Sequence, residues 1–169
     1  LNDGSTTQFT FENASIMPNW LPSGKSLIYN SIPALLKIKD LGGASGSRTV
    51  IEDIGIIALP GTIGSNGRTL LSTVIGQASL GDVYVSDLGD ATPTFEPVLT
   101  TPAAEWGPDL SPDGKWMTYC SDETGREEIF VQPYPPTGAK WQISKDGGRG
   151  SQWSHRGDEI FFVEGHNFY

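Results

Sequence analysis

A turn centred on glycine recurs along this chain at nearly constant spacing. In the clearest copy, Ser111-Pro112-Asp113-Gly114, the proline presets φ, the aspartate bonds nearby backbone and the glycine accepts positive φ. Three further copies of the turn place their glycine at Gly24, Gly67 and Gly157. The separations are 43, 47 and 43 residues, and a fixed period of this size indicates stacked structural repeats.

The residues around the clearest turn predict four short antiparallel strands. These are the Pro-containing stretch 106–110, the aromatic and apolar run 116–120, the segment 129–131, and the alternating segment 141–143. Four such strands in about 43 residues are typical of one propeller blade. The sequence therefore predicts an all-β fold, a β-propeller fragment of about three and a half blades. An unrelated β-sandwich is the alternative, and it does not explain why turn, strand and aromatic positions repeat together.

The expected blades cover approximately residues 16–55, 56–101, 102–147 and, incompletely with two strands, 148–169. Residues 1–15 are expected to supply a strand of a preceding blade or a closing strand, because 6–12 alternates in polarity. Propellers close with four to eight blades, so we expect the whole chain, 1–169, to be part of a larger propeller. Unpaired edges of open blades favour pairing with another chain, and self-association is expected.

Several segments resemble the TolB-like (WD-like) repeats of bacterial β-propellers. They are 110–115, 153–154 and the run 125–133 followed by 141–144 and 146–148. This last run resembles the version often appended to bacterial Ser/Thr protein kinases. Similar repeats form the first domain of prolyl-oligopeptidase-type peptidases. The resemblance covers about 16–165 and implies a scaffold with an interaction surface rather than an active site. TolB-like propellers are often periplasmic, so the resemblance favours a periplasmic or extracytoplasmic location over a cytoplasmic one.

No pattern in the sequence assigns catalysis to this chain. His155 and His166 are the two histidines and lack carboxylates at ligand spacing. The segment 111–116 is one residue short of the Asp box of sialidase-type propellers, and loop carboxylates lack the regular spacing of a Ca²⁺ loop. Cys120 ends a predicted buried strand beside acidic residues, which disfavour a reactive thiolate. We expect no catalytic residue, cofactor or metal site.

Charge and hydropathy limit the classes of partner. A formal net charge of −9 argues against nucleic acid, because binding phosphates requires a basic surface. No run of about 18 apolar residues is present, so no membrane insertion is expected. A protein or peptide partner is the remaining expectation.

The blade geometry predicts where such a partner binds. Connections between blades (102–106 and 145–151) and loops between second and third strands (76–81 and 121–128) meet at one end of the central channel. The candidate interaction residues there are Glu105, Trp106, Glu123, Arg126, Glu127 and Arg149. The sequence thus predicts a non-enzymatic scaffold and protein-interaction module. The alternative is the propeller domain of a larger kinase or peptidase whose catalytic domain lies outside this chain.

Overall fold

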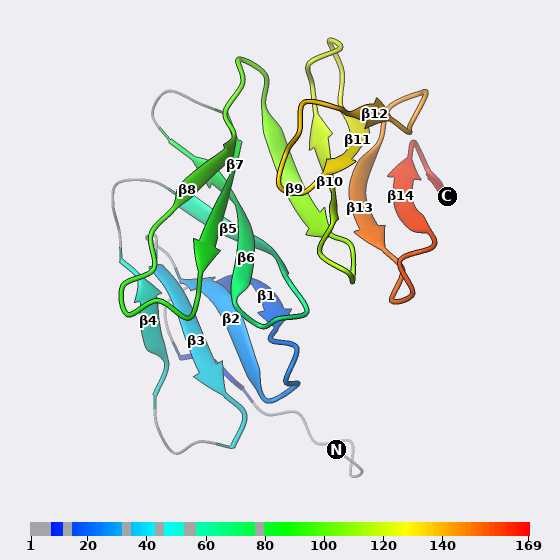
Figure 1. Ribbon diagram of the computed structural model, residues 1–169. Coiled ribbons are helices and arrows are strands. Elements are labelled where there is room, and N and C mark those ends of the chain that lie inside the picture. The colour runs from blue at the N-terminus through cyan, green and yellow to red at the C-terminus, as the bar shows by residue number, and fades with distance from the viewer. Residues whose placement is uncertain (1–7, 12–14, 32–34, 43–45, 53–56, 77–79) are drawn as a thin grey trace.

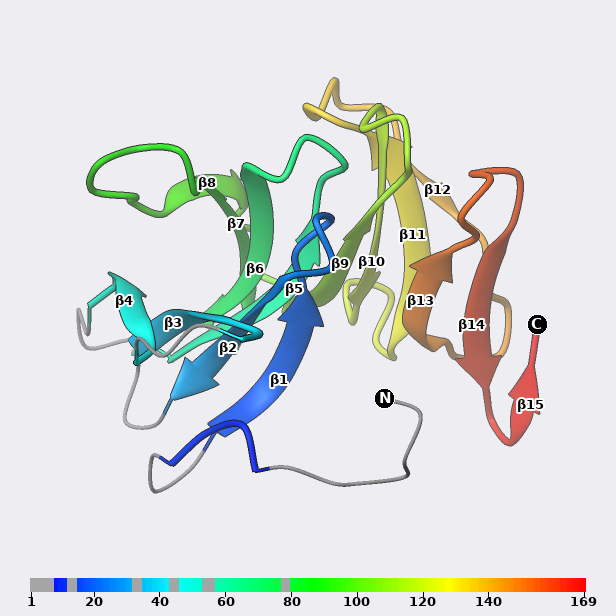
Figure 2. The same ribbon diagram turned by 90° about the horizontal axis from the view of Figure 1, so that it is seen from below.

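The computed structural model describes residues 8–11, 15–31, 35–42, 46–52, 57–76 and 80–169. Within these ranges all regular structure is β, arranged as small antiparallel sheets that follow one another around an arc (Figures 1 and 2). This confirms the predicted all-β propeller fold. No helix in the described part of the chain has the length and apolar character to cross a membrane.

Each sheet is a meander in sequence order. The first contains β1 (Ser15–Trp20), β2 (Ser26–Ser31), β3 (Leu35–Asp40) and β4 (Arg48–Ile51). The second contains β5 (Ile57–Ile63), β6 (Thr69–Ile75), β7 (Asp82–Asp87) and β8 (Glu96–Leu99). The third contains β9 (Glu105–Leu110), β10 (Trp116–Ser121), β11 (Glu128–Pro133) and β12 (Trp141–Gln142), and the fourth contains β13 (Arg149–Trp153), β14 (Ile160–Glu164) and β15 (Asn167–Phe168).

Two details differ from the sequence-based expectation. The fourth sheet has a third strand, β15, because the backbones of Phe162 and Tyr169 exchange two hydrogen bonds at the end of the chain.

The second difference concerns the strand expected over 6–12. Its described residues, 8–11, do not form a strand. Lys39 Nζ donates a hydrogen bond to the carbonyl oxygen of Phe9 at 2.6 Å, which places this segment beside β3. The remaining residues of that expected strand lie outside the described ranges.

The four repeated glycines occupy equivalent hairpin turns between the first and second strand of each sheet. Gly24, Gly67, Gly114 and Gly157 have φ between 65° and 74°, where a side chain is disfavoured. In each turn the glycine N–H donates to the carbonyl oxygen three residues earlier, at 2.8–3.0 Å. In the clearest turn, Asp113 Oδ1 also accepts from the Ser111 hydroxyl at 2.7 Å, and Pro112 precedes it at the second turn position.

Side chains six residues after the turn glycine connect each sheet to the next. Asn30 Nδ2 donates to the Ala58 carbonyl oxygen at 2.9 Å, and the Gly107 N–H donates to Thr73 Oγ1 at 3.0 Å. At the third sheet, Cys120 Sγ donates to the Gly148 carbonyl oxygen at 3.2 Å. Three chemically different residues of second strands therefore bond to the backbone near the beginning of the following sheet, Asn30 and Cys120 as donors and Thr73 as an acceptor.

A second series of bonds joins the first strands, which lie side by side in Figure 2. Five residues before the turn glycine, Asn19 Nδ2 donates to the Pro60 carbonyl oxygen at 3.1 Å. Asp109 accepts a hydrogen bond from Thr62 and, through Oδ2, one from the Trp153 N–H at 2.7 Å. Apolar residues fill the space between the sheets, with one cluster between the first and second and another between the second and third.

We predict that Asp109→Ala destabilises the protein by about 1–3 kcal/mol, because it leaves a partly buried N–H of Trp153 without its acceptor. Asp109→Asn, which retains an acceptor oxygen, should lose less. The free energy of unfolding in urea measures both. The exposed Asp90→Ala is the matched control, and a loss in Asp109→Ala no larger than in this control would contradict the role of the bond.

Candidate functional site

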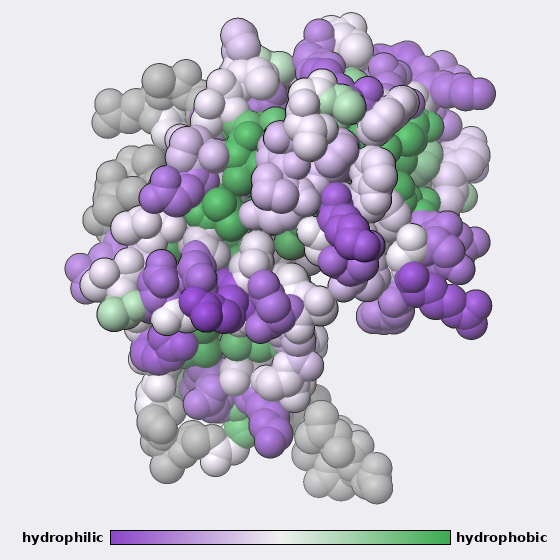
Figure 3. Space-filling view, in the orientation of Figure 1, coloured by the Kyte–Doolittle hydropathy of each residue, from purple (hydrophilic) through white to green (hydrophobic). Residues whose placement is uncertain are grey.

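The connections between sheets and the loops between second and third strands lie at the same end of the molecule. This follows from the meander, because a first strand begins, and the antiparallel second strand ends, at that side. We call residues 100–104, 122–127 and 143–148 the loop end, which is uppermost in Figure 1. Figure 3 shows hydrophilic residues gathered there, over the third and fourth sheets. Part of the expected loop 76–81 lies outside the described residues.

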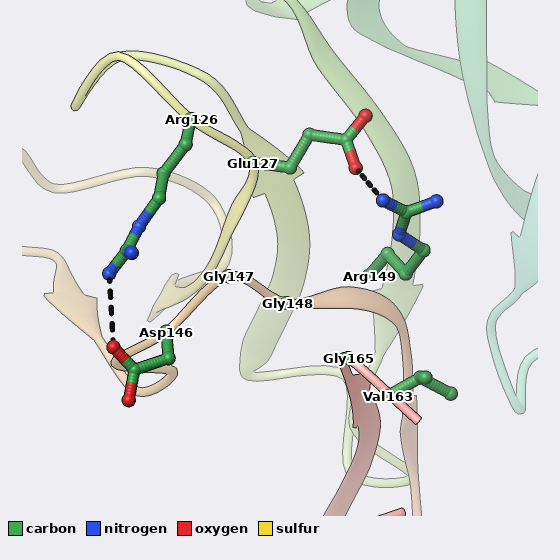
Figure 4. A pocket seen from close by; sticks show the side chains of 8 residues that line it. All are labelled: Arg126, Glu127, Asp146, Gly147, Gly148, Arg149, Val163 and Gly165. Atoms are coloured by element: carbon green, nitrogen blue, oxygen red, sulfur yellow. Dashed lines mark ion pairs between the residues drawn. The ribbon is translucent and has the colours of Figure 1, made fainter. Parts of the chain in front are cut away.

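One cavity of the loop end, which we call the Arg149 cavity, has a volume of about 300 Å³ (Figure 4). Its lining residues are Arg126, Glu127, Asp146, Gly147, Gly148, Arg149, Val163 and Gly165. Three of the six candidate residues from the sequence thus lie around one hollow. Arg149 Nη2 pairs with Glu127 Oε2 at 3.1 Å, and the Arg149 side chain is 73% exposed.

Arg126, on the other side of this cavity, is held by the protein itself. Its Nε pairs with Glu128 Oε1 at 2.5 Å, and its Nη2 donates to the carbonyl oxygen of Lys145 and lies 3.8 Å from Asp146 Oδ1. Substitution of Arg126 is therefore expected to affect the loop structure as well as any ligand. Arg149, with one carboxylate partner and an exposed guanidinium, is the better residue for testing binding.

Glu128, which the sequence analysis did not single out, fixes the loops around the Arg149 cavity. It is 1% exposed and accepts hydrogen bonds from the Ser144 hydroxyl, from Arg126 and, at 3.2 Å, from the Gly147 N–H. Burial alone would raise the pKa of this carboxyl group, but the hydrogen bonds from Ser144 and Arg126 lower the pKa below its ordinary value. The ionised side chain joins the loop 122–127 to the connection 143–148.

A second cavity of about 500 Å³, the Lys140 cavity, opens on the neighbouring part of the loop end. It is lined by Thr101, Pro102, Ala103, Asp122, Glu123 and Lys140. Two hydrogen bonds hold Asp122 against Ala104 in the wall of this cavity. Asp122 Oδ1 accepts from the Ala104 N–H at 2.9 Å, and the Asp122 N–H donates to the Ala104 carbonyl oxygen at 3.3 Å. Glu123, a fourth candidate residue, pairs here with Lys140.

The remaining two candidates, Glu105 and Trp106, belong to β9 rather than to a loop. Trp106 is partly exposed, whereas Glu105 is 1% exposed. Burial raises the pKa of the Glu105 carboxyl group, and a hydrogen bond from Thr101 opposes this effect. Glu105 therefore lies beneath the surface and does not offer its carboxylate to a partner on the outside of this chain.

The described residues contain no group of three or more His, Cys, Asp or Glu side chains arranged to hold a metal ion. His155 and His166 are both exposed, His155 in the turn at the opposite end from the cavities. Cys120 is buried, and its pKa is raised to about 12 by burial and by the charge of Glu127. Its thiol is thus neutral at physiological pH and acts as a cross-sheet hydrogen-bond donor.

No family model matches the chain. Its structure is similar to that of putative TolB from Agrobacterium tumefaciens, with a TM-score of 0.70 and 23% identity over 88% of this chain and 53% of that chain. TolB from Acinetobacter baumannii gives a TM-score of 0.72 and 19% identity over 92% of this chain and 39% of that chain. Prolyl oligopeptidase B from Galerina marginata gives a TM-score of 0.59 and 15% identity over 83% of this chain and 21% of that chain.

These comparisons establish a TolB-like propeller fold, and at such identities they establish the fold alone. The chain spans about half of the A. tumefaciens protein and less of the other two. The resemblance expected from the repeats is therefore confirmed for the fold, while the association with protein kinases is not among the findings.

We predict that the ionised Glu128 contributes to stability at neutral pH. Its folded-state pKa lies below the ordinary value, so this contribution is present above the unfolded-state pKa and is lost as pH falls through the folded-state pKa. Glu128→Gln should cost about 1–3 kcal/mol at pH 7. The difference in unfolding free energy between wild type and Glu128→Gln should shrink as pH falls below about 4.5. A difference that is constant with pH would contradict this role.

Proposed function

We propose that this chain is a non-enzymatic interaction module that binds a protein or peptide at its loop end. The observation that carries the proposal is the pair of cavities, the Arg149 cavity and the Lys140 cavity, in loops that the third and fourth sheets hold in place. Both fall at the low end of the size range of ligand sites and are lined by charged side chains. They suit individual side chains of a polypeptide.

The charge distribution supports a polypeptide partner. The net charge of −9 disfavours nucleic acid, and the loop end carries both signs of charge. Exposed arginine with unused donors, as at Arg149, is common where proteins meet, because the planar guanidinium binds carboxylates with two parallel hydrogen bonds. Glu127 beside it provides the opposite charge. Together they favour a partner segment with its own mixed charges.

We further propose that the blades correspond to residues 16–55, 56–101, 102–147 and 148–169, with 1–15 preceding them, within a larger bacterial protein.

A second candidate function is the propeller domain of a larger enzyme with its catalytic domain outside this chain. The similarity to prolyl oligopeptidase B favours a peptidase, and the repeat resemblance favours a Ser/Thr protein kinase. The open reading frame that encodes this segment distinguishes the two candidate functions, because a catalytic domain fused to the propeller would support the second one. An extracytoplasmic location is also proposed, and a secretion signal in that reading frame tests it.

Self-association through the outer sheets is part of the proposal. Phe161 and Phe168 on the fourth sheet are 45% and 84% exposed, and Trp20 on the first sheet is 56% exposed. Apolar side chains at sheet faces favour contact with another blade. Light scattering should give a mass that rises with protein concentration, whereas a concentration-independent monomer mass would contradict self-association.

We predict that Arg149→Glu weakens the binding of peptides selected from a displayed random library against the wild-type protein. The reversal repels a ligand carboxylate and breaks the pair with Glu127, so the expected loss is at least tenfold in Kd. Arg149 is highly exposed, and the melting temperature should change little.

Arg156→Glu is the matched control, since it reverses an exposed arginine in the turn at the opposite end of the molecule. It should leave the affinity unchanged. Selected peptides that lose affinity with Arg156→Glu and retain it with Arg149→Glu would place the binding surface at the wrong end of the molecule. Failure to select any peptide with an Arg149-dependent affinity would equally reject the proposal.

A further inference from the structure

The Lys140 cavity holds the ammonium group of one of the chain's own lysines. Lys140 Nζ donates a hydrogen bond to Glu123 Oε2 and lies 5.4 Å from the centre of the Phe130 ring. A carboxylate together with an aromatic ring is the combination that recognises alkylammonium groups, through a charge-assisted hydrogen bond and a cation–π contact. Lys140 remains 42% exposed, so this contact is at the surface and open to competition.

The residues that line this cavity carry more negative charge than one lysine neutralises. Asp122 and Glu123 both line it, and Lys140 is the cation among its lining residues. Glu105 lies directly behind the wall, because the hydroxyl of Thr101, a lining residue, donates to Glu105 Oε1. The charge of Glu123 acts on the carboxyl group of Glu105, which places the two groups near each other.

Glu105 adds a buried acidic group behind this wall, but its side chain is covered and does not contact a ligand in the cavity. Its Oε2 atom is buried and accepts no hydrogen bond within the described structure, although the residue is 1% exposed. Buried carboxylate oxygens without a donor are uncommon and destabilising. A cation in the cavity, whether Lys140 or a lysine that replaces it, offsets the negative charge of Glu123 that acts on Glu105.

We propose that the Lys140 cavity receives a lysine side chain of the partner protein, and that Lys140 occupies the site in its absence. Lys140 itself demonstrates that a lysine ammonium reaches both Glu123 and Phe130. The chain's net charge of −9 attracts a basic segment. A metal ion is a poorer occupant, because the described carboxylates do not form a metal-binding group. The inference rests on the proposed function and names the chemistry that the loop end selects.

The test is a titration followed by NMR chemical shifts of the backbone amides, with the 169-residue chain and the blocked peptide acetyl-Ala-Lys-Ala-amide. Lys140→Ala removes the internal competitor and should bind this peptide at least fivefold more tightly than wild type. The shifts should concentrate at 101–104 and 121–124. The same peptide with norleucine in place of lysine, which keeps the chain length and lacks the charge, should not bind.

Two further variants make the result specific. Lys25→Ala removes an exposed lysine beside the Gly24 turn, at the opposite end of the molecule, and should leave the affinity at the wild-type value. Adding Glu123→Gln to Lys140→Ala should abolish the gain. Melting temperatures check that each variant is folded. Equal affinity in wild type and Lys140→Ala, or binding that survives Glu123→Gln, would overturn the proposal.

The source of the ammonium group is decided by a third peptide, Ala-Norleucine-Ala-amide with a free amino terminus. Binding of this peptide to Lys140→Ala in place of the lysine peptide would assign the cavity to a chain terminus and reject a lysine side chain. If library peptides depend on Arg149 while Lys140→Ala changes nothing, this inference fails and the proposed function stands. If no library peptide depends on Arg149, the proposed function fails whatever the lysine peptide does.

Discussion

Hydrogen bonds between consecutive sheets set the position of everything else in this structure. Asn30, Thr73 and Cys120 occupy the same place in three successive repeats, and each bonds to the backbone of the following sheet. The contacts join a buried side chain to a main-chain group, so they fix the stagger of one sheet against the next more directly than apolar packing does. The positions of the sheets in turn set the positions of the loops that connect their strands.

The architecture was predictable because its signature is local. The turn glycines must adopt positive φ, and their spacing counts the sheets. The cross-sheet bonds were not predictable, since asparagine, threonine and cysteine do not resemble one another in sequence although each reaches a neighbouring backbone group. Glu105 was expected in the connection 102–106 between two blades. The strand β9 nevertheless begins at Glu105, because Glu105 pairs with Ser121 of β10.

The site was predictable in part. Blade geometry places loops from adjacent repeats at one end, and Arg126, Glu127 and Arg149 do lie around one cavity. The sequence did not distinguish Glu127 from Glu128, since two consecutive glutamates look alike until one is buried against Ser144. The contact of Lys140 with Glu123 spans 17 residues and two loops, and it depends on how those loops fold over Phe130.

The central claim is that the loop end, held by the sheets beneath it, is the binding surface. Hydrogen–deuterium exchange of the chain with and without a selected peptide tests this most directly. The account predicts slower exchange on binding within 100–104, 122–127 and 143–148, with the turns at 111–115 and 154–158 unchanged. Protection confined to those turns, or spread along the outer strands, would contradict it.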